Sequence, residues 1–373
     1  MMNNTHNNEK LLVAMELSNS KWRLAFMAVG GEKVRQKVIG ARDRRGFSAE
    51  LCLTKDKLGL SADARVQCCY EAGRDGFWIY RWLVHEGLGC HVVDPASIEV
   101  NRRKRRAKTD RLDAQSLLRL LHRYETGDCK IWSVVHVPTE QQEDELRLHR
   151  ELSRLKKERT AHRCRIKSLL VLHGISLSGT LHNLDRHLDG LKQWNGRPLP
   201  EGIREELHRE CLRMKQICEQ IKVIEKQKAE RITSPQTQTD KQISALLRLK
   251  GVGEVSAWVL AKEFFGWREF KNRREVGALA GLTPTPYDSG GSRSEQGISK
   301  AGSRRVRSVM IELAWSWVRF QPESELTRWF EKRFAHGSKR MRRVGIVALA
   351  RKLLVALWKY LEFEEIPEGA VIS

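Results

Sequence analysis

The amino-acid sequence predicts a multidomain α/β plus α protein, with an N-terminal mixed sheet, a central pair of long helices and a C-terminal helical region. Three observations predict this architecture. Short apolar runs alternate with helical segments up to about residue 130. Two long, charged segments with an apolar stripe follow. The last third is helical with Gly-rich turns. We therefore expect a disordered tail and four further regions, with boundaries at 1–9, 10–130, 139–240, 241–320 and 321–373.

The composition points to a nucleic-acid partner. The 373 residues include 68 Lys and Arg against 46 Asp and Glu, a formal net charge of +22. Ribosomal and chromatin proteins can be as basic, but this chain has 11 Trp and no biased tract. Its eight cysteines form no C-x-x-C pair and no zinc-site spacing, so we expect reduced thiols in a cytoplasm. No apolar run is long enough to span a membrane, so no membrane partner is expected.

The N-terminal region is expected to form an α/β layer in which two strands end in acids. Glu16 and Glu71 close two apolar runs, and open α/β sheets place their sites at the carboxyl ends of strands. Gly30-Gly31 predicts a hairpin turn between the second and third strands. Strands are expected at 11–17, 22–29, 32–41, 66–71 and 90–95, with helices at 46–60 and 77–86.

A basic run and two aspartates follow this layer. Asp110 and Asp113 begin a predicted helix, with Thr109 as its N-cap, so the two carboxylates can share one helix face. With Glu16 and Glu71 they would make four carboxylates whose repulsion a cation must relieve, and Mg²⁺ or Mn²⁺ takes such oxygen ligands. The alternative is a solvated basic loop and two aspartates that complement the helix dipole. The basic residues expected to contact nucleic acid are Arg102, Arg103, Lys104, Arg105, Arg106 and Lys108.

The middle of the chain predicts two long amphipathic helices, at 139–172 and 201–234, separated by the irregular segment 174–200. Such a pair is typical of an antiparallel coiled coil. It can serve as a dimerisation arm, or as a spacer that packs only within its own chain. Nine basic residues crowd the first helix between 147 and 167, and we expect them to lie along phosphates.

The C-terminal third predicts a helix, a Gly-x-Gly turn and a second helix over 246–261. This pattern is similar to a helix-hairpin-helix, in which Gly251 and Gly253 let backbone N–H groups approach a phosphate. The alternative is an ordinary helix–helix turn. Ser289 lies in a Gly-flanked segment expected to be a loop, with Lys300, Arg304 and Arg307 following as candidate phosphate contacts. Residues 315–359 are expected to be helical and basic, and 362–373 to be a loose tail.

Several strings of the sequence resemble one known family. They are "YEAG" at 70–73, "KTDRLDAQSLLRLL" at 108–121, and "AGLTP", "SGG", "GISKAG" and "RRVR" in that order between 280 and 307. Over about residues 10–320 the chain resembles the RuvC-like, DEDD-type transposases of bacterial insertion sequences, the insertion-sequence-110 family in its 1111 branch. The resemblance implies an RNase H/RuvC-like N-terminal fold. It also implies metal ligation by Glu16, Glu71, Asp110 and Asp113, and a nucleophilic serine at Ser289.

The same resemblance implies partners for this chain, and at two positions the sequence differs from the family's usual residues. It implies donor and target DNA, a guide non-coding RNA, a homodimer or tetramer in which acids of one protomer meet Ser289 of another, and a nucleoid-associated location. The family usually has Asp where this chain has Glu16, and two serines where this chain has Asp288 and Ser289. Two alternatives stay open: a RuvC-like junction endonuclease that uses water, and a non-catalytic nucleic-acid scaffold.

Overall fold

The computed structural model of this chain describes residues 9–98, 110–177, 179, 181, 184–289 and 292–372. Within these ranges it does not describe the side chains of residues 110–111, 287–289 and 292–296. The first eight residues of the predicted tail, the basic run 102–108 and the Thr109 cap lie outside the described residues. The chain forms two compact units, Met1–Pro138 and Thr139–Ser373.

The N-terminal unit is built on a five-stranded sheet with the order β3-β2-β1-β4-β5. Neighbours β1, β2 and β3 are antiparallel, whereas β1, β4 and β5 are parallel, so the predicted mixed sheet is confirmed. The strands are β1 (Lys10–Leu17), β2 (Lys21–Ala28), β3 (Arg35–Gly40), β4 (Arg65–Glu71) and β5 (Gly89–Val93), and the helices are α1 (Arg44–Leu58), α2 (Trp78–His85) and α3 (Asp110–Glu125).

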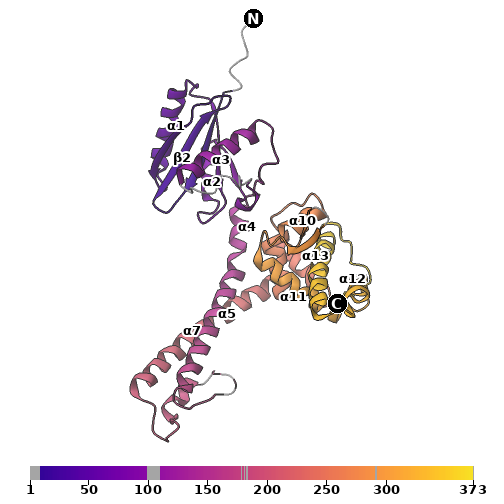
Figure 1. Ribbon diagram of the computed structural model, residues 1–373. Helices are drawn as coiled ribbons and strands as arrows, with labels where there is room; N and C mark the ends of the chain where they lie inside the picture. Colours follow the sequence, from indigo (N-terminus) through magenta and orange to yellow (C-terminus); the bar gives the residue numbers. More distant parts are fainter. Residues whose placement is uncertain are drawn as a thin grey trace. The chain divides into compact units, whose positions relative to one another are not determined.

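Helices cover both faces of this sheet, and the side chains of each strand point alternately to one face and the other. In β1, Leu11, Val13 and Met15 pack with α1 and α2 on one face. Leu12 and Ala14 point to the other face, where α3 packs. Figure 1 shows α1 and α3 beside the strands. The near-continuous apolar run of β1 is the pattern expected of a strand buried on both faces.

The second unit contains the two long helices, α5 (Arg147–Val171) and α7 (Glu201–Thr233). They lie antiparallel along one another, as Figure 1 shows, with ion pairs Lys156–Glu225 and Arg165–Glu206 at 2.7 Å each. The helix predicted from residue 139 is interrupted: α4 (Glu140–Glu145), started by a capping box of Thr139 and Gln142, precedes α5. Short helices α6 (Leu184–His187) and η4 (Leu188–Gly190) lie in the predicted irregular segment.

The rest of the second unit surrounds one large apolar core in which Trp258 and Trp317 are fully buried. The elements are α8 (Gln238–Leu247), α9 (Glu254–Trp258), η5 (Val259–Phe265), α10 (Arg273–Leu279), β6 (Pro284–Ser289), β7 (Ser292–Ile298), α11 (Arg304–Phe320), α12 (Glu325–Phe330), η6 (Glu331–Ala335) and α13 (Lys339–Phe363). Within the described part of the chain, none of the helices has the length and apolar character needed to cross a membrane.

The end of the chain is docked, so the expectation of a loose tail was wrong. The buried Gln321 accepts a hydrogen bond from Val371 N–H at 2.7 Å and donates to Val371 O at 2.9 Å. Leu249 pairs with Ile372 in an isolated β-bridge. No sequence pattern signals this docking, because it depends on backbone hydrogen bonds to one glutamine and not on an apolar periodicity.

Candidate functional site

Two of the predicted acids lie side by side on neighbouring strands. Met15 of β1 pairs with Tyr70 of β4 in parallel register, so Glu16 and Glu71 follow at the next position of each strand. Adjacent strands are about 4.8 Å apart. By alternation, Glu16 shares a face with Ala14, and that face is the one that α3 covers. Both acids therefore stand at the carboxyl end of the sheet, on the side of α3.

The direction of α3 is fixed by an ion pair at its far end. Glu125, its last residue, is 2.6 Å from Lys10 Nζ at the start of β1 and 3.0 Å from His91 Nε2. The helix therefore runs antiparallel to β1, with its first turn toward the end of that strand. The lengths agree: from Glu125 to Asp113 is about 18 Å along a helix, and from Lys10 to Glu16 is about 20 Å along a strand. Asp113 thus arrives beside the strand end that carries Glu16.

Asp113 also lies on the correct face of α3. It is half-buried, one turn before Leu117 and two turns before Leu121, which both pack on the sheet. Asp110, whose side chain is outside the description, is the first residue of α3 and stands one turn before Ala114, which is buried in the same cluster. The helix positions of both aspartates belong to the stripe that faces the sheet.

The candidate acids Glu16, Glu71 and Asp113 lie at an edge of the sheet that is accessible to solvent. Among the described side chains, no three His, Cys, Asp or Glu residues are close enough together to hold a metal ion. Glu71 is exposed, and Glu16 and Asp113 are half-buried. Mg²⁺ usually keeps several waters and uses one or two carboxylates plus substrate phosphates, so an exposed edge of carboxylate oxygens is chemically suited to it.

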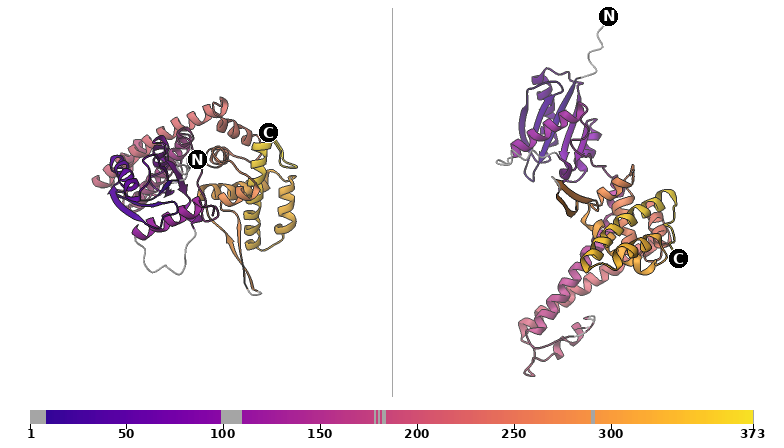
Figure 2. Two further views of the ribbon diagram at one scale, coloured as in Figure 1. Left: turned by 90° about the horizontal axis from the view of Figure 1, so that it is seen from above. Right: turned by 45° about the vertical axis from the view of Figure 1, so that its right-hand side comes forward.

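Ser289 lies in the second unit, on a β-hairpin and not on the loop that the sequence predicted. It is the last residue of β6, pairs with Ser292 of β7, and its side chain is outside the description. Figure 2 shows the hairpin extending from the helices of its unit. At its base, Ile298 packs against the apolar core. The prediction was wrong because these strands carry mostly polar residues, so they lack the apolar alternation that signals a strand.

The predicted phosphate contacts near Ser289 differ in their surroundings. Lys300 and Arg304 are exposed, and Arg304 begins α11 after the Ser303 cap. Arg307 is half-buried, and its Nη1 donates to the carbonyls of Ala301 and Gly302 at 3.2 Å each. Arg307 therefore holds the turn before α11 in place, in addition to any role with a ligand.

The predicted Gly-x-Gly turn connects α8 to α9. Gly251 has φ +91°, and a side chain there would lie 3.1 Å from Phe320 Cβ, so the position requires glycine. Ser316 Oγ donates to Gly251 O at 2.7 Å. Gly253 caps α9 without a side-chain hydrogen bond, but Glu254 brings a negative charge to the first turn. An anion at this helix start would have to compete with that carboxylate.

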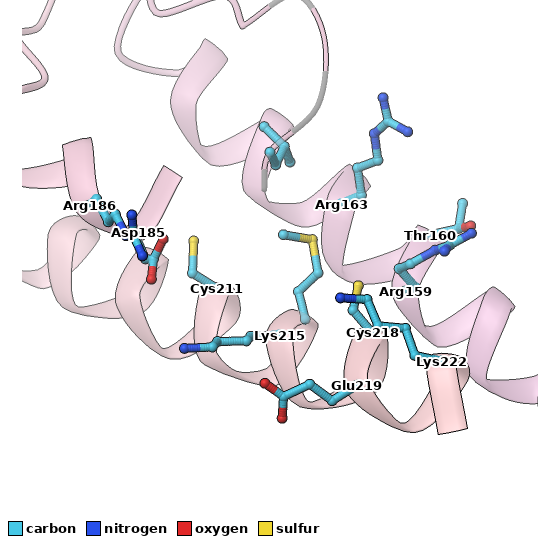
Figure 3. A pocket seen from close by; sticks show the side chains of 12 residues that line it. Arg159, Thr160, Arg163, Asp185, Arg186, Cys211, Lys215, Cys218, Glu219 and Lys222 are labelled. Carbon is cyan, nitrogen blue, oxygen red and sulfur yellow. The ribbon is translucent and has the colours of Figure 1, made fainter. Parts of the chain in front are cut away.

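A cavity of about 640 Å³ lies between α5 and α7, in the arm that these helices form. Figure 3 shows Cys211 and Cys218, two turns apart on α7, on the side that faces it. Burial, with smaller contributions from Asp185 and Glu210, raises the pKa of Cys211 to about 11, so this thiol stays protonated. Sequence reasoning named the cations of α5 but missed those of α7, where Lys alternates with Glu. The basic residues that line the cavity are Arg159, Arg163, Arg186, Lys215 and Lys222.

Comparison with known proteins gives consistent similarities. The family described as "Transposase IS116/IS110/IS902 family" matches residues 243–328, from α8 into α12. The putative transposase y4rJ of Sinorhizobium fredii (strain NBRC 101917 / NGR234) is 40% identical, over 97% of this chain and 94% of that protein. The transposase for insertion sequence element IS1328 of Yersinia enterocolitica is 28% identical, over 59% of this chain and 63% of that protein.

Proposed function

Because this chain belongs to the IS110 family of insertion-sequence transposases, we propose that it cuts and rejoins DNA by metal-dependent phosphoryl transfer with a serine nucleophile. In this proposal Glu16, Glu71, Asp110 and Asp113 form the RuvC-like acidic site. The observation that carries it is the antiparallel course of α3 along β1, which is fixed by Lys10 and Glu125. That course directs the first turn of α3 toward the strand ends that carry the two glutamates.

The carboxylates would hold one or two Mg²⁺ or Mn²⁺ ions together with the phosphate of the DNA. A bound divalent metal polarises a phosphoryl oxygen and lowers the charge that repels an attacking oxygen. Glu16 and Glu71 are fixed by backbone hydrogen bonds of two paired strands, and Asp113 is fixed by the packing of α3. A site built on strands and a packed helix holds its ligands with less freedom than a site on loops.

Ser289 would supply the attacking oxygen. In the step we propose, the Oγ–P bond forms, one P–O bond of the DNA backbone breaks, and the serine proton leaves with a carboxylate or the departing oxygen as acceptor. A position at the end of a hairpin that extends from the helices of its unit would let the hydroxyl reach a phosphodiester. The proposal requires Ser289 and the four acids to act on one phosphodiester, supplied by one protomer or by two.

The partners in this proposal are donor DNA, target DNA and a guide RNA, all of which carry phosphate charge. The net charge of +22 favours such polyanions. The antiparallel pair α5 and α7 would be the arm of a homodimer or tetramer, and its exposed Leu172, Leu212 and Val223 leave apolar surface for a second copy.

The test compares three substitutions in the full-length protein, purified with its bound RNA and supplied with Mg²⁺ and a plasmid that carries the ends of the element. Asp113→Asn is expected to abolish cleavage and joining while DNA binding persists. Ser289→Ala is expected to abolish the covalent protein–DNA link and joining. Asp128→Asn is the matched control, since that aspartate is exposed and its partner among the described residues is Arg123, at the other end of α3. Normal cleavage by Asp113→Asn would contradict the acidic site. Cleavage without a covalent link in the wild-type protein would favour a water nucleophile.

A further inference from the structure

A second cavity, of about 560 Å³, lies among the C-terminal helices. It is an open hollow at the surface, because nearly all the residues that line it are exposed. Its walls come from α11, from the end of η6 and from the start of α13. The residues that line it are Trp315, Ala335, Gly337, Lys339, Arg342 and Arg343.

Trp315 gives this cavity an aromatic wall. The residue is 41% exposed, whereas Trp317, two positions along α11, is fully buried in the core. The indole of Trp315 meets the ring of Phe330 edge to face, with centroids 6.4 Å apart. Single exposed apolar residues are common on protein surfaces, so exposure alone decides nothing. The ring is informative because it stands in a cavity beside three cations.

The cations of this cavity have no acidic partner among the residues that the structure describes. Lys339, Arg342 and Arg343 are exposed, and within the described residues none of them forms an ion pair with a carboxylate. The first turn of α13 contains no acid. The dipole of a long helix makes cations unfavourable at its start, so this concentration of positive charge costs stability that a bound anion would restore. Local sequence choices that oppose stability are expected at functional sites.

The frame behind the cavity is closely packed. A side chain at Gly345 of α13 would lie 2.4 Å from the ring of Phe334, so the glycine allows η6 to lie directly on α13. The ring of Phe334 stacks on Phe330, with centroids 6.0 Å apart, and Phe330 in turn supports Trp315. The packing therefore fixes the separation of the helices that carry the aromatic wall and the cations before any ligand binds.

We propose that this cavity binds one unpaired nucleotide, with its base stacked on Trp315 and its phosphate held by Lys339, Arg342 and Arg343. An aromatic face next to cations is the combination by which proteins hold single-stranded nucleic acid without reading its sequence. Bases inside a duplex are already stacked on their neighbours, so only an unpaired base can present its face to the indole. The inference rests on the proposed function, because strand exchange on DNA requires strands that are temporarily unpaired.

The test measures binding of the full-length protein to a dye-labelled oligo(dT) of about 12 nucleotides, a length within the usual site size of single-strand binders. A backbone of the same length with abasic sites is the second probe. The wild-type protein is expected to prefer oligo(dT). Trp315→Ala is expected to weaken oligo(dT) binding roughly 5- to 150-fold and to remove that preference. Trp315→Phe, which keeps a ring, should restore most of it and guards against a folding defect.

Two further variants sharpen the result. Trp194→Ala removes an 80% exposed tryptophan of the same unit and should leave both affinities unchanged. Arg342→Gln should weaken the binding of both probes by the same factor. It should also reduce the slope of log affinity against log salt by about 0.7, because the variant neutralises one phosphate fewer than the wild type. Equal affinity of Trp315→Ala and wild type for oligo(dT) would overturn the inference, as would a preference of the wild type for the corresponding duplex.

The outcome is separable from that of the proposed function. Oligo(U) binding that is stronger than oligo(dT) binding and equally sensitive to Trp315 would identify RNA as the source of the nucleotide. If Asp113→Asn abolishes cleavage while Trp315→Ala changes no affinity, the function stands and the cavity inference fails. If Trp315→Ala removes the base preference while Asp113→Asn still cleaves, the inference stands and the acidic site fails.

Discussion

Lys10 and Glu125 are 115 positions apart in the sequence, yet the Lys10 ammonium lies 2.6 Å from the Glu125 carboxylate. The pair joins the start of β1 to the end of α3, and His91 adds a second contact to the same carboxylate at 3.0 Å. Because an α-helix is stiff over this length, this pair and the packing of Leu117 and Leu121 on the sheet together set the position of its first turn. The position of the candidate acidic site therefore depends on an interaction at the opposite end of the helix.

Glu125→Gln should lower the free energy of unfolding of the N-terminal unit by about 1.5–3 kcal/mol at pH 7, the usual value of hydrogen bonds to a charged group. Burial raises the pKa of Glu125, but Lys10 and His91 outweigh it, so the pKa is lowered in the folded protein. A lowered carboxyl pKa stabilises the fold above the unfolded value, and this stabilisation is lost as the pH falls through the folded pKa. Urea unfolding should thus show a difference between variant and wild type that shrinks in acid. A difference that does not change with pH would contradict the ion pair.

Glu16→Gln tests whether Glu16, at a position where the family usually has aspartate, still acts as a metal ligand. The change keeps the size of the side chain and removes its charge, and we expect DNA cleavage to fall on the order of 10²–10³-fold, as for loss of one electrostatic contact to the reacting group. Glu16→Asp should retain activity, since it restores the residue usual in the family. Gel assays of plasmid cleavage over a range of Mg²⁺ concentrations measure both. Full activity of Glu16→Gln would remove Glu16 from the site.

The sequence predicted the strand ends, and with them the places of Glu16 and Glu71 in the sheet, because strand ends depend on local patterns. Apolar runs end at Glu16 and Glu71, and a helical stripe begins at Asp110, so each element could be recognised within a few residues. The relation between the elements could not be predicted in this way. It depends on Lys10 and Glu125, on the register of β1 with β4, and on a polar hairpin around Ser289, none of which leaves a periodic signal.

Lys262→Met should be strongly destabilising. The Lys262 ammonium is fully buried, 2.7 Å from Asp240 and 2.9 Å from Glu145, and so links α4, α8 and η5. Removing one partner of a buried ion pair leaves an uncompensated charge and costs about 3–5 kcal/mol. Lys226→Met is the control, because its pair with Glu230 is exposed and worth about 0.3–0.5 kcal/mol. Urea midpoints of the second unit measure both, and equal midpoints would mean that the buried cluster contributes nothing.

Deleting residues 364–373 should open the second unit at its end. The docked segment donates Val371 N–H to the buried Gln321 Oε1, and the deletion removes that bond, whereas Gln321 Nε2 keeps its bond to Lys250 O. A buried polar group that loses its partner costs about 1–3 kcal/mol. Limited proteolysis should therefore cut the truncated protein faster than the wild type between α11 and α12. Gln321→Ala in the full chain should have a similar effect, and resistance of both variants equal to wild type would mean that the end of the chain is not docked in solution.

His149 should make the second unit sensitive to mild acid. The imidazole is 4% exposed, and burial, together with the charges of Lys228, Arg305, Arg150 and Lys156, lowers its pKa to about 4. The unfolded chain binds a proton near pH 6.5 and the folded chain does not, so stability falls as the pH drops from about 6.5 to about 4. The expected loss from this group between pH 7 and pH 5 is about 2 kcal/mol. His149→Leu should flatten the dependence of the urea midpoint on pH over that interval, and His208→Leu, on α7 beside Asp189, is the comparison variant. An unchanged slope in His149→Leu would show that His149 is protonated in the fold, which its surrounding cations oppose.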